Sequence, residues 1–136
     1  MPLLPPLAPV LAALAAFAFG AAYYIALSKP WIAALQTNPD DLKAAQSGRV
    51  SPFLVVFAAE LLMAVMLLGV MGHMGPITVR AGLITAALIW LGFVLPTMAG
   101  NHAFQGATRA LTLIDSGHWL GVLLIEGAVL GLMAAP

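Results

Sequence analysis

Long apolar runs separated by short polar segments are the dominant pattern of this chain. A membrane-spanning helix needs about 20 mostly apolar residues, because the hydrocarbon core of a bilayer is roughly 30 Å thick. Four runs meet this requirement and predict spans at residues 10–27, 52–73, 77–100 and 108–133. Within the third span, Pro96 predicts a kink. The pattern therefore predicts an all-α fold, an integral membrane four-helix bundle formed by residues 1–136 as one domain.

The polar segment between the first two spans, residues 29–50, predicts a connection with helices of its own. Trp31 to Leu35 is typical of a short interfacial helix, with Trp31 and Lys29 as anchors at the membrane interface. Asn38 followed by Pro39 has the residue types of a helix start, an Asn cap and a Pro in the first turn. We expect a short interfacial or cytoplasmic helical connection here.

The amino-acid composition indicates that the predicted helices lie in a membrane. Hydrophobic residues make up 62% of the chain and charged residues 7%, whereas a soluble domain carries roughly 25% charged residues. Five Lys or Arg and five Asp or Glu are too few to cover a water-soluble surface. The formal charge of zero gives no basic surface for nucleic acid. The expected partner is therefore the lipid bilayer, and the absence of cysteine excludes disulfides and thiolate sites.

The positive side chains are divided unevenly between the connections. Lys29, Lys43 and Arg49 lie in the first connection and Arg109 in the third, whereas Arg80 alone lies near the second. Because Lys and Arg favour cytoplasmic loops, this division predicts that both termini lie on the outer side of the membrane. No Lys or Arg precedes the first apolar run, so we expect that run to be retained rather than cleaved as a signal peptide.

Four titratable side chains lie within the predicted spans: Glu60, Asp115, His118 and Glu126. A charged side chain at the bilayer centre costs about 2.5–3.5 kcal/mol on insertion scales, and no Lys or Arg lies deep enough to pair with these groups. At about 100° per residue, Asp115, His118 and Glu126 share one face of the fourth span. We expect neutral carboxyls that are hydrogen-bonded to neighbouring helices.

A second polar face is predicted on the third span, where Asn101 is spaced with Trp90, Val94, Thr97 and Phe104. Six polar or aromatic side chains are expected to meet at the cytoplasmic end of the bundle: Tyr23, Tyr24, Asn101, His102, Asp115 and His118. Two interpretations remain open for this cluster. It forms either a proton-linked or ligand-binding cavity, or interhelical hydrogen bonds worth about 0.6 kcal/mol each.

Small residues recur every four positions in two spans. The fourth span contains Gly117-x-x-x-Gly121 and Gly127-x-x-x-Gly131, and the first contains Ala12-x-x-x-Ala16-x-x-x-Gly20. This spacing predicts close helix packing without identifying the partner helix.

Motifs of catalysis are missing from the sequence. There is no His-x-x-x-His spacing, no Gly-rich phosphate loop and no convincing setting for a nucleophile. We therefore expect no enzyme, no metal and no cofactor. A haem or chlorophyll-type ligand on His118 needs only a suitably placed histidine, and nothing else in the sequence supports one.

Two groups of short motifs resemble a known family. Phe17 to Tyr24 followed by Lys29-Pro30-Trp31 is similar to the opening of the bacterial "domain of unknown function 1761" family. Asn101 to Phe104 and Leu113 to His118 are similar to its closing half. The resemblance covers about residues 11–133 and implies a small four-helix protein of the bacterial inner membrane. It implies no activity, because the role of the family is unassigned.

This chain departs from the family pattern at several positions. Tyr23 replaces the usual Trp, and Asp115 replaces a common Asn, while Glu60 and Glu126 lie outside the pattern. Those two acids would then serve something particular to this branch of the family.

Two functional hypotheses follow from the sequence. The first is a non-catalytic membrane module that oligomerises or docks on a larger membrane complex. The alternative is a small oligomeric transporter, proton-coupled through its intramembrane Glu, Asp and His side chains. In both hypotheses we expect a homo-oligomer or a subunit of a larger complex.

Overall fold

The computed structural model describes residues 6–134 and contains four long helical rods. Three are single helices, and the third rod is built from α5, the π-helical turn η1 and α6. Their bounds are α1 Ala8–Ala26, α4 Pro52–Met74, α5 Val79–Ile89, η1 Trp90–Val94, α6 Leu95–Gln105 and α7 Arg109–Met133. Each rod is long and apolar enough to cross a membrane. The all-α prediction is confirmed, and the chain is a multi-pass membrane protein.

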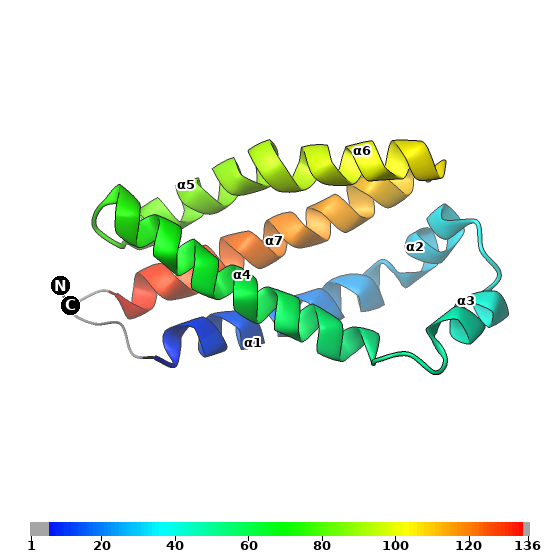
Figure 1. Cartoon of the computed structure of the whole chain (residues 1–136), viewed down its shortest axis with the longest axis horizontal. Helices are drawn as coiled ribbons and strands as arrows, with labels where there is room; N and C mark the ends of the chain where they lie inside the picture. The colour runs from blue at the N-terminus through cyan, green and yellow to red at the C-terminus, as the bar shows by residue number, and fades with distance from the viewer. Residues whose placement is uncertain (1–5, 135–136) are drawn as a thin grey trace.

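The four rods run alternately up and down, so that α1 begins and α7 ends at the same end of the molecule (Figure 1). The third rod, Val79–Gln105, continues further than the predicted residues 77–100. It ends where Gly106 adopts a left-handed backbone with φ of 68°, a conformation that glycine accepts without steric cost. Asn101 and His102 therefore lie within the last turns of α6 rather than beyond the end of the helix.

The connection between the first two rods contains two short helices, α2 Ser28–Leu35 and α3 Pro39–Gln46. As predicted, the Asn38 side chain caps α3 by accepting a hydrogen bond from the Asp40 amide at 2.9 Å. Thr108 Oγ1 donates to the Ala34 carbonyl at 2.8 Å and ties α2 to the beginning of α7. The α2 helix is thus fastened to the end of the bundle.

The irregularity expected at Pro96 takes the form of the η1 turn just before it. Leu95 N–H bonds to Trp90 O, five residues back, instead of the usual four. Proline lacks an N–H, and its ring would clash with the carbonyl four residues earlier in a regular helix. A wider turn before Pro96 is one of the established ways for a helix to accommodate this residue.

Helix α7 lies against α1, α4 and α5 and forms the middle of the bundle. Its contact with α5 is backbone to backbone, because a Cβ added to Gly127 would lie 2.5 Å from the Gly82 carbonyl oxygen. Gly131 packs in the same way against the backbone of Thr78 and Val79. Toward α1, Gly121 faces the ring of Phe19. The predicted small-residue motifs therefore find their partners within this chain.

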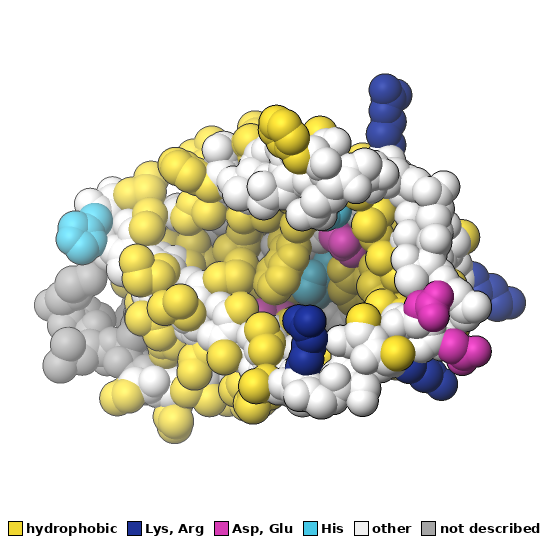
Figure 2. Space-filling model, turned by 45° about the vertical axis from the view of Figure 1, so that its right-hand side comes forward, with side chains coloured by type: hydrophobic (Ala, Val, Ile, Leu, Met, Phe, Trp, Pro, Cys, Tyr) yellow, Lys and Arg dark blue, Asp and Glu magenta, His cyan; other side chains and the backbone are white. Residues whose placement is uncertain are grey.

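The outer surface of the bundle is apolar over most of its length. Large hydrophobic side chains point outward, among them Phe53, Phe93 and Leu113, each more than 70% exposed. On the face shown in Figure 2, the charged side chains of the surface lie in one half, and apolar side chains cover most of the other. This distribution matches a protein whose solvent is lipid.

Candidate functional site

A polar centre formed by Glu60, His118 and Glu126 lies among helices α1, α4 and α7. Both carboxyl side chains are fully buried, and His118 is 3% exposed. Glu60 lies on the inward face of α4, together with the buried residues Ala64 and Leu67. His118 and Glu126 are eight residues apart on α7 and share its inward face. The predicted polar face of the fourth span is therefore real, and it points into the bundle.

Five buried polar atoms of this centre have no hydrogen-bond partner among residues 6–134. Both oxygens of Glu60, both oxygens of Glu126 and Nδ1 of His118 are buried without a hydrogen bond to any described residue. Buried side-chain polar atoms in proteins are mostly paired, and leaving one unpaired costs about 1–3 kcal/mol. The prediction that the carboxyls are hydrogen-bonded to neighbouring helices is therefore wrong for Glu60 and Glu126 among the described residues.

Gly20 of α1 makes the space in which the centre assembles. A Cβ added to Gly20 would lie 2.7 Å from His118 Nε2 and 3.8 Å from Glu60 Oε1. The histidine from α7 and the carboxyl from α4 therefore approach the same point on α1. The sequence predicts Gly20 both as a packing residue and, four residues before Tyr24, on the face of the first span that points to the bundle axis. Its approach to His118 and Glu60 was not predicted.

Asp115 is paired, in contrast to the three groups of the polar centre. Its Oδ1 accepts a hydrogen bond from Tyr24 Oη at 2.7 Å and another from Trp31 Nε1 at 3.1 Å. Tyr23 Oη donates to the Ile114 carbonyl at 2.6 Å. One carboxyl thus joins α1, α2 and α7. Trp31, expected only as an interface anchor, directs its indole N–H to Asp115, whereas Lys29, the other expected anchor, is exposed.

Aromatic rings enclose His118. The ring of Tyr24 lies 4.9 Å from the imidazole and that of Trp119 lies 4.7 Å from it, measured between centroids. Phe19 stacks on the histidine at 6.4 Å, and Tyr23 lies 5.8 Å away. The side chain therefore sits between the paired Asp115 on one side and the unpaired carboxyls on the other.

Asn101 and His102 do not join this cluster, which corrects the expected gathering at one end. Asn101 is exposed, and Phe104 of the same predicted face is 99% exposed. His102 Nδ1 lies 2.9 Å from Thr112 Oγ1. The predicted face assumed regular helical spacing through residues 90–104. The η1 turn adds about one residue, and at 3.6 residues per turn this rotates every later side chain by about 100°.

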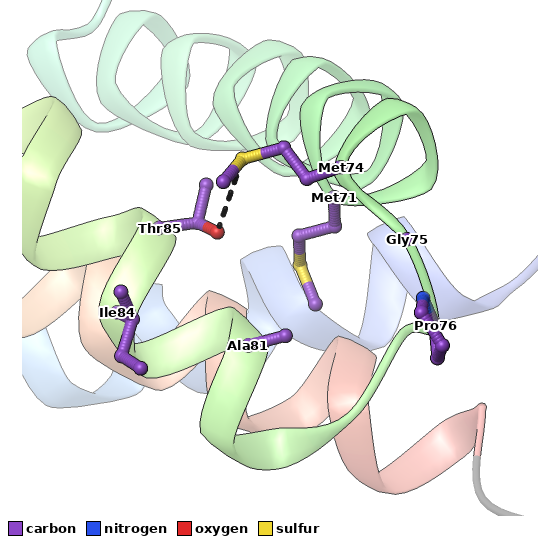
Figure 3. Close-up of a pocket in the computed structure, with 7 residues that line it drawn as sticks. All are labelled: Met71, Met74, Gly75, Pro76, Ala81, Ile84 and Thr85. Atoms are coloured by element: carbon purple, nitrogen blue, oxygen red, sulfur yellow. Dashed lines mark hydrogen bonds between the residues drawn. The ribbon is translucent and has the colours of Figure 1, made fainter.

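Two hollows lie outside the polar centre. One, about 560 Å³, lies between α4 and α6 and includes Asn101, His102 and Trp119 in its lining. The other, about 260 Å³, lies at the turn between α4 and α5 (Figure 3). Met71 and Met74 line it together with Thr85, whose hydroxyl donates to Met74 Sδ at 3.8 Å. This second hollow has no titratable side chain in its lining and offers no acid–base chemistry.

Within residues 6–134, no group of three or more His, Asp or Glu side chains is arranged to hold a metal ion. The polar centre instead has groups that can bind protons, because two carboxyls and an imidazole are buried in the interior of the bundle.

Comparison with known proteins gives one match. The family model described as "Protein of unknown function (DUF1761)" matches residues 7–131 and so includes every residue of the polar centre. No curated protein and no solved structure matches the chain. The matched segment covers nearly all of the sequence, and the chain belongs to the DUF1761 family.

Proposed function

We propose that this DUF1761 protein is a small proton-coupled membrane transporter in which Glu60, His118 and Glu126 bind and release protons inside the bundle. The observation that carries the proposal is the set of five buried polar atoms without partners. Intramembrane ionisable residues that face a bundle interior mark ion and proton pathways. A carboxyl that served only to join helices would form a hydrogen bond with a group on a neighbouring helix. Neither Glu60 nor Glu126 forms such a bond with any described residue.

The arrangement around Asp115 supports a route for protons between the polar centre and the end of the bundle that carries α2. Asp115 lies one helical turn from His118, and Tyr24 contacts both. Tyrosine and carboxylate groups relay protons along hydrogen bonds. No covalent chemistry is involved in this proposal, in keeping with the expectation that the protein is not an enzyme. The aromatic enclosure of His118 also supports a histidine that carries no haem or chlorophyll-type ligand.

The docking-module hypothesis loses two of its supports. The glycines that suggested an adhesive face, Gly127 and Gly131, already pack against α5 within the chain. The mid-membrane acids face the interior of one bundle rather than its surface. We propose that transport proceeds through an oligomer, because four helices leave little room for a path.

Infrared spectroscopy of the protein in lipid tests the proposal directly, because protonated and ionised carboxyls absorb differently. We expect a protonated-carboxyl band that weakens as the pH is raised across the range in which the centre exchanges protons. Glu60→Gln and Glu126→Gln should each remove part of this pH-dependent band. Asp41→Asn is the matched control, because Asp41 is exposed on α3 and far from the bundle interior.

Proton movement into liposomes under an imposed membrane potential supplies the second measurement. We expect uptake by the wild type and by Asp41→Asn, and its loss in both Glu→Gln variants. A carboxyl band that does not respond to pH, together with no proton uptake by the folded wild type, would overturn the proposal in favour of the docking module.

We propose further that the protein resides in the bacterial inner membrane with both termini on the outer side. Lys29, Lys43 and Arg49 on the connection and Arg109 at the start of α7 support this orientation. Cysteines introduced at Asp41 and Gln105 should then be protected from an impermeant thiol reagent in intact cells. Labelling of both would reverse the orientation.

A further inference from the structure

The hollow between α4 and α6 is a groove that opens on the side of the bundle. Both helices pack on α7, but they diverge from one another toward the end of α6 (Figure 1). Ala59 and Met63 of α4 form one wall, α6 forms the other, and Trp119 of α7 contributes to the lining. The volume of about 560 Å³ is that of a pocket for a small organic molecule.

The α6 wall is polar and the α4 wall is apolar. Thr97, Asn101 and Gln105 recur every four residues and therefore lie on one face of α6. Thr97 donates its hydroxyl to the Phe93 carbonyl of the preceding turn, so the amides of Asn101 and Gln105 are the free polar groups of this face. None of the side chains that line the groove is an Asp, Glu, Lys or Arg.

The polarity also changes along the groove. Gln105 and Asn101 lie near the end of α6, whereas Phe93 and Met63 lie two or more helical turns deeper in the rods. Hydrogen-bonding groups thus occupy the end nearest the membrane surface, and apolar side chains occupy the part nearest the middle. The occupant that satisfies both parts has a polar head and one apolar tail.

From these features we infer that the α4–α6 groove binds an uncharged, single-tailed amphiphile that enters from the bilayer, with its hydroxyl or carbonyl oxygens at Asn101 and Gln105. The head is uncharged because the lining holds no Asp, Glu, Lys or Arg, and its one histidine, His102, is already engaged with Thr112 of α7. The inference goes beyond proton coupling and does not depend on it. The groove lies beside the polar centre, since Trp119 in its lining has its ring 4.7 Å from that of His118, measured between centroids.

Trp119 provides the readout. A monoacylglycerol with a dibrominated acyl chain, added at low mole fraction to vesicles of unbrominated phosphatidylcholine, should quench tryptophan fluorescence in a saturable manner. Trp119→Phe should remove the saturable component, because Trp31 and Trp90 do not line the groove. Brominated phosphatidylglycerol should give only the quenching that rises in proportion to its mole fraction.

Two adjacent alanines form the matched pair of variants. Ala59→Leu adds three carbons inside the groove and should weaken saturable quenching by about tenfold or more. Ala58→Leu adds the same carbons at an exposed position of α4 outside the groove and should leave it unchanged. Asn101→Leu and Gln105→Leu, both at exposed positions, should also weaken binding without unfolding the protein.

Four results would overturn the inference. The first is quenching proportional to mole fraction for every probe, which would mean an ordinary lipid-facing surface. The second is equal saturable binding of the anionic probe. The third is saturable quenching that persists unaltered in Ala59→Leu. The fourth is crosslinking that places a second copy of the chain in the groove. Because none of these readouts involves proton movement, failure here is distinguishable from failure of the proposed transport function.

Discussion

Helix α7 makes two contacts of opposite character through adjacent residues. Gly127 meets Gly82 of α5 backbone to backbone, with no room for one added carbon. Glu126, the residue before it, points about 100° away around the helix and lies fully buried with no hydrogen-bond partner among the described residues. The glycine contact resembles the packing that holds membrane helices together. The polar centre departs from what stability alone requires, which points to function.

The largest effect is expected from breaking the glycine contact. In Gly127→Ala the added Cβ would lie 2.5 Å from a backbone carbonyl, so α5 and α7 must separate. Overpacking of this kind costs about 1–3 kcal/mol, and we expect a loss of stability at the upper end of this range in detergent unfolding. Gly69→Ala on α4 is the control, because nothing lies within 4 Å of its added carbon. Equal stability of the two variants would contradict the backbone contact.

A smaller effect is expected where the polar centre meets α1. In Gly20→Ala the added Cβ would lie 2.7 Å from His118 Nε2, but this is the end of a side chain that can rotate. We expect a loss of stability of about 1 kcal/mol, at the low end for overpacking, and a displaced imidazole. Nuclear magnetic resonance of the His118 ring should report the displacement. Gly92→Ala, which meets nothing within 4 Å, should leave the ring resonances in place.

The third effect concerns the paired carboxyl that lies between the two regions. Tyr24→Phe removes one of the two hydrogen bonds to Asp115 Oδ1 and leaves the bond from Trp31 intact. Interhelical hydrogen bonds in membrane proteins contribute about 0.6 kcal/mol on average, so the unfolding free energy should fall by about this amount. A loss of several kcal/mol would mean that Asp115 is part of the stabilising core rather than of a relay.

The sequence was most informative where a helix is regular from end to end. The positions of Glu60 on α4 and of His118 and Glu126 on α7 follow from a repeat of 3.6 residues without interruption. The cap at Asn38 was also predictable, because it depends on neighbours in the chain. Local and periodic features of the fold could therefore be read from the sequence.

Features that depend on a distant partner could not be predicted in this way. The pairing of Trp31 with Asp115 joins residues that are 84 positions apart, and the space at Gly20 becomes evident only once α4 and α7 lie against α1. The position of Asn101 was wrong for a different reason. Pro96 predicted an irregularity in the helix. The sequence did not show that this irregularity would be a π-helical turn, which rotates the side chains of α6 relative to those of α5.

The smallest effect on stability is expected at the two unpaired carboxyls. Glutamine has nearly the size of glutamic acid and matches its neutral form in polarity, so Glu60→Gln and Glu126→Gln should unfold within about 0.5 kcal/mol of the wild type if both carboxyls are neutral in the folded protein. Reversible unfolding at one pH, with Asp41→Asn as the exposed control, makes the comparison. If either glutamate were ionised in the interior, its replacement would remove a buried charge and raise stability well beyond this limit. A marked loss of stability would instead reveal hydrogen bonds that only a carboxyl supplies. Glu60 and Glu126 would then stabilise the fold, as the contact between Gly127 and Gly82 does. Unchanged stability combined with a lost protonated-carboxyl band would show that the two neighbouring residues have different roles. Gly127 would be required for the fold and Glu126 for proton exchange.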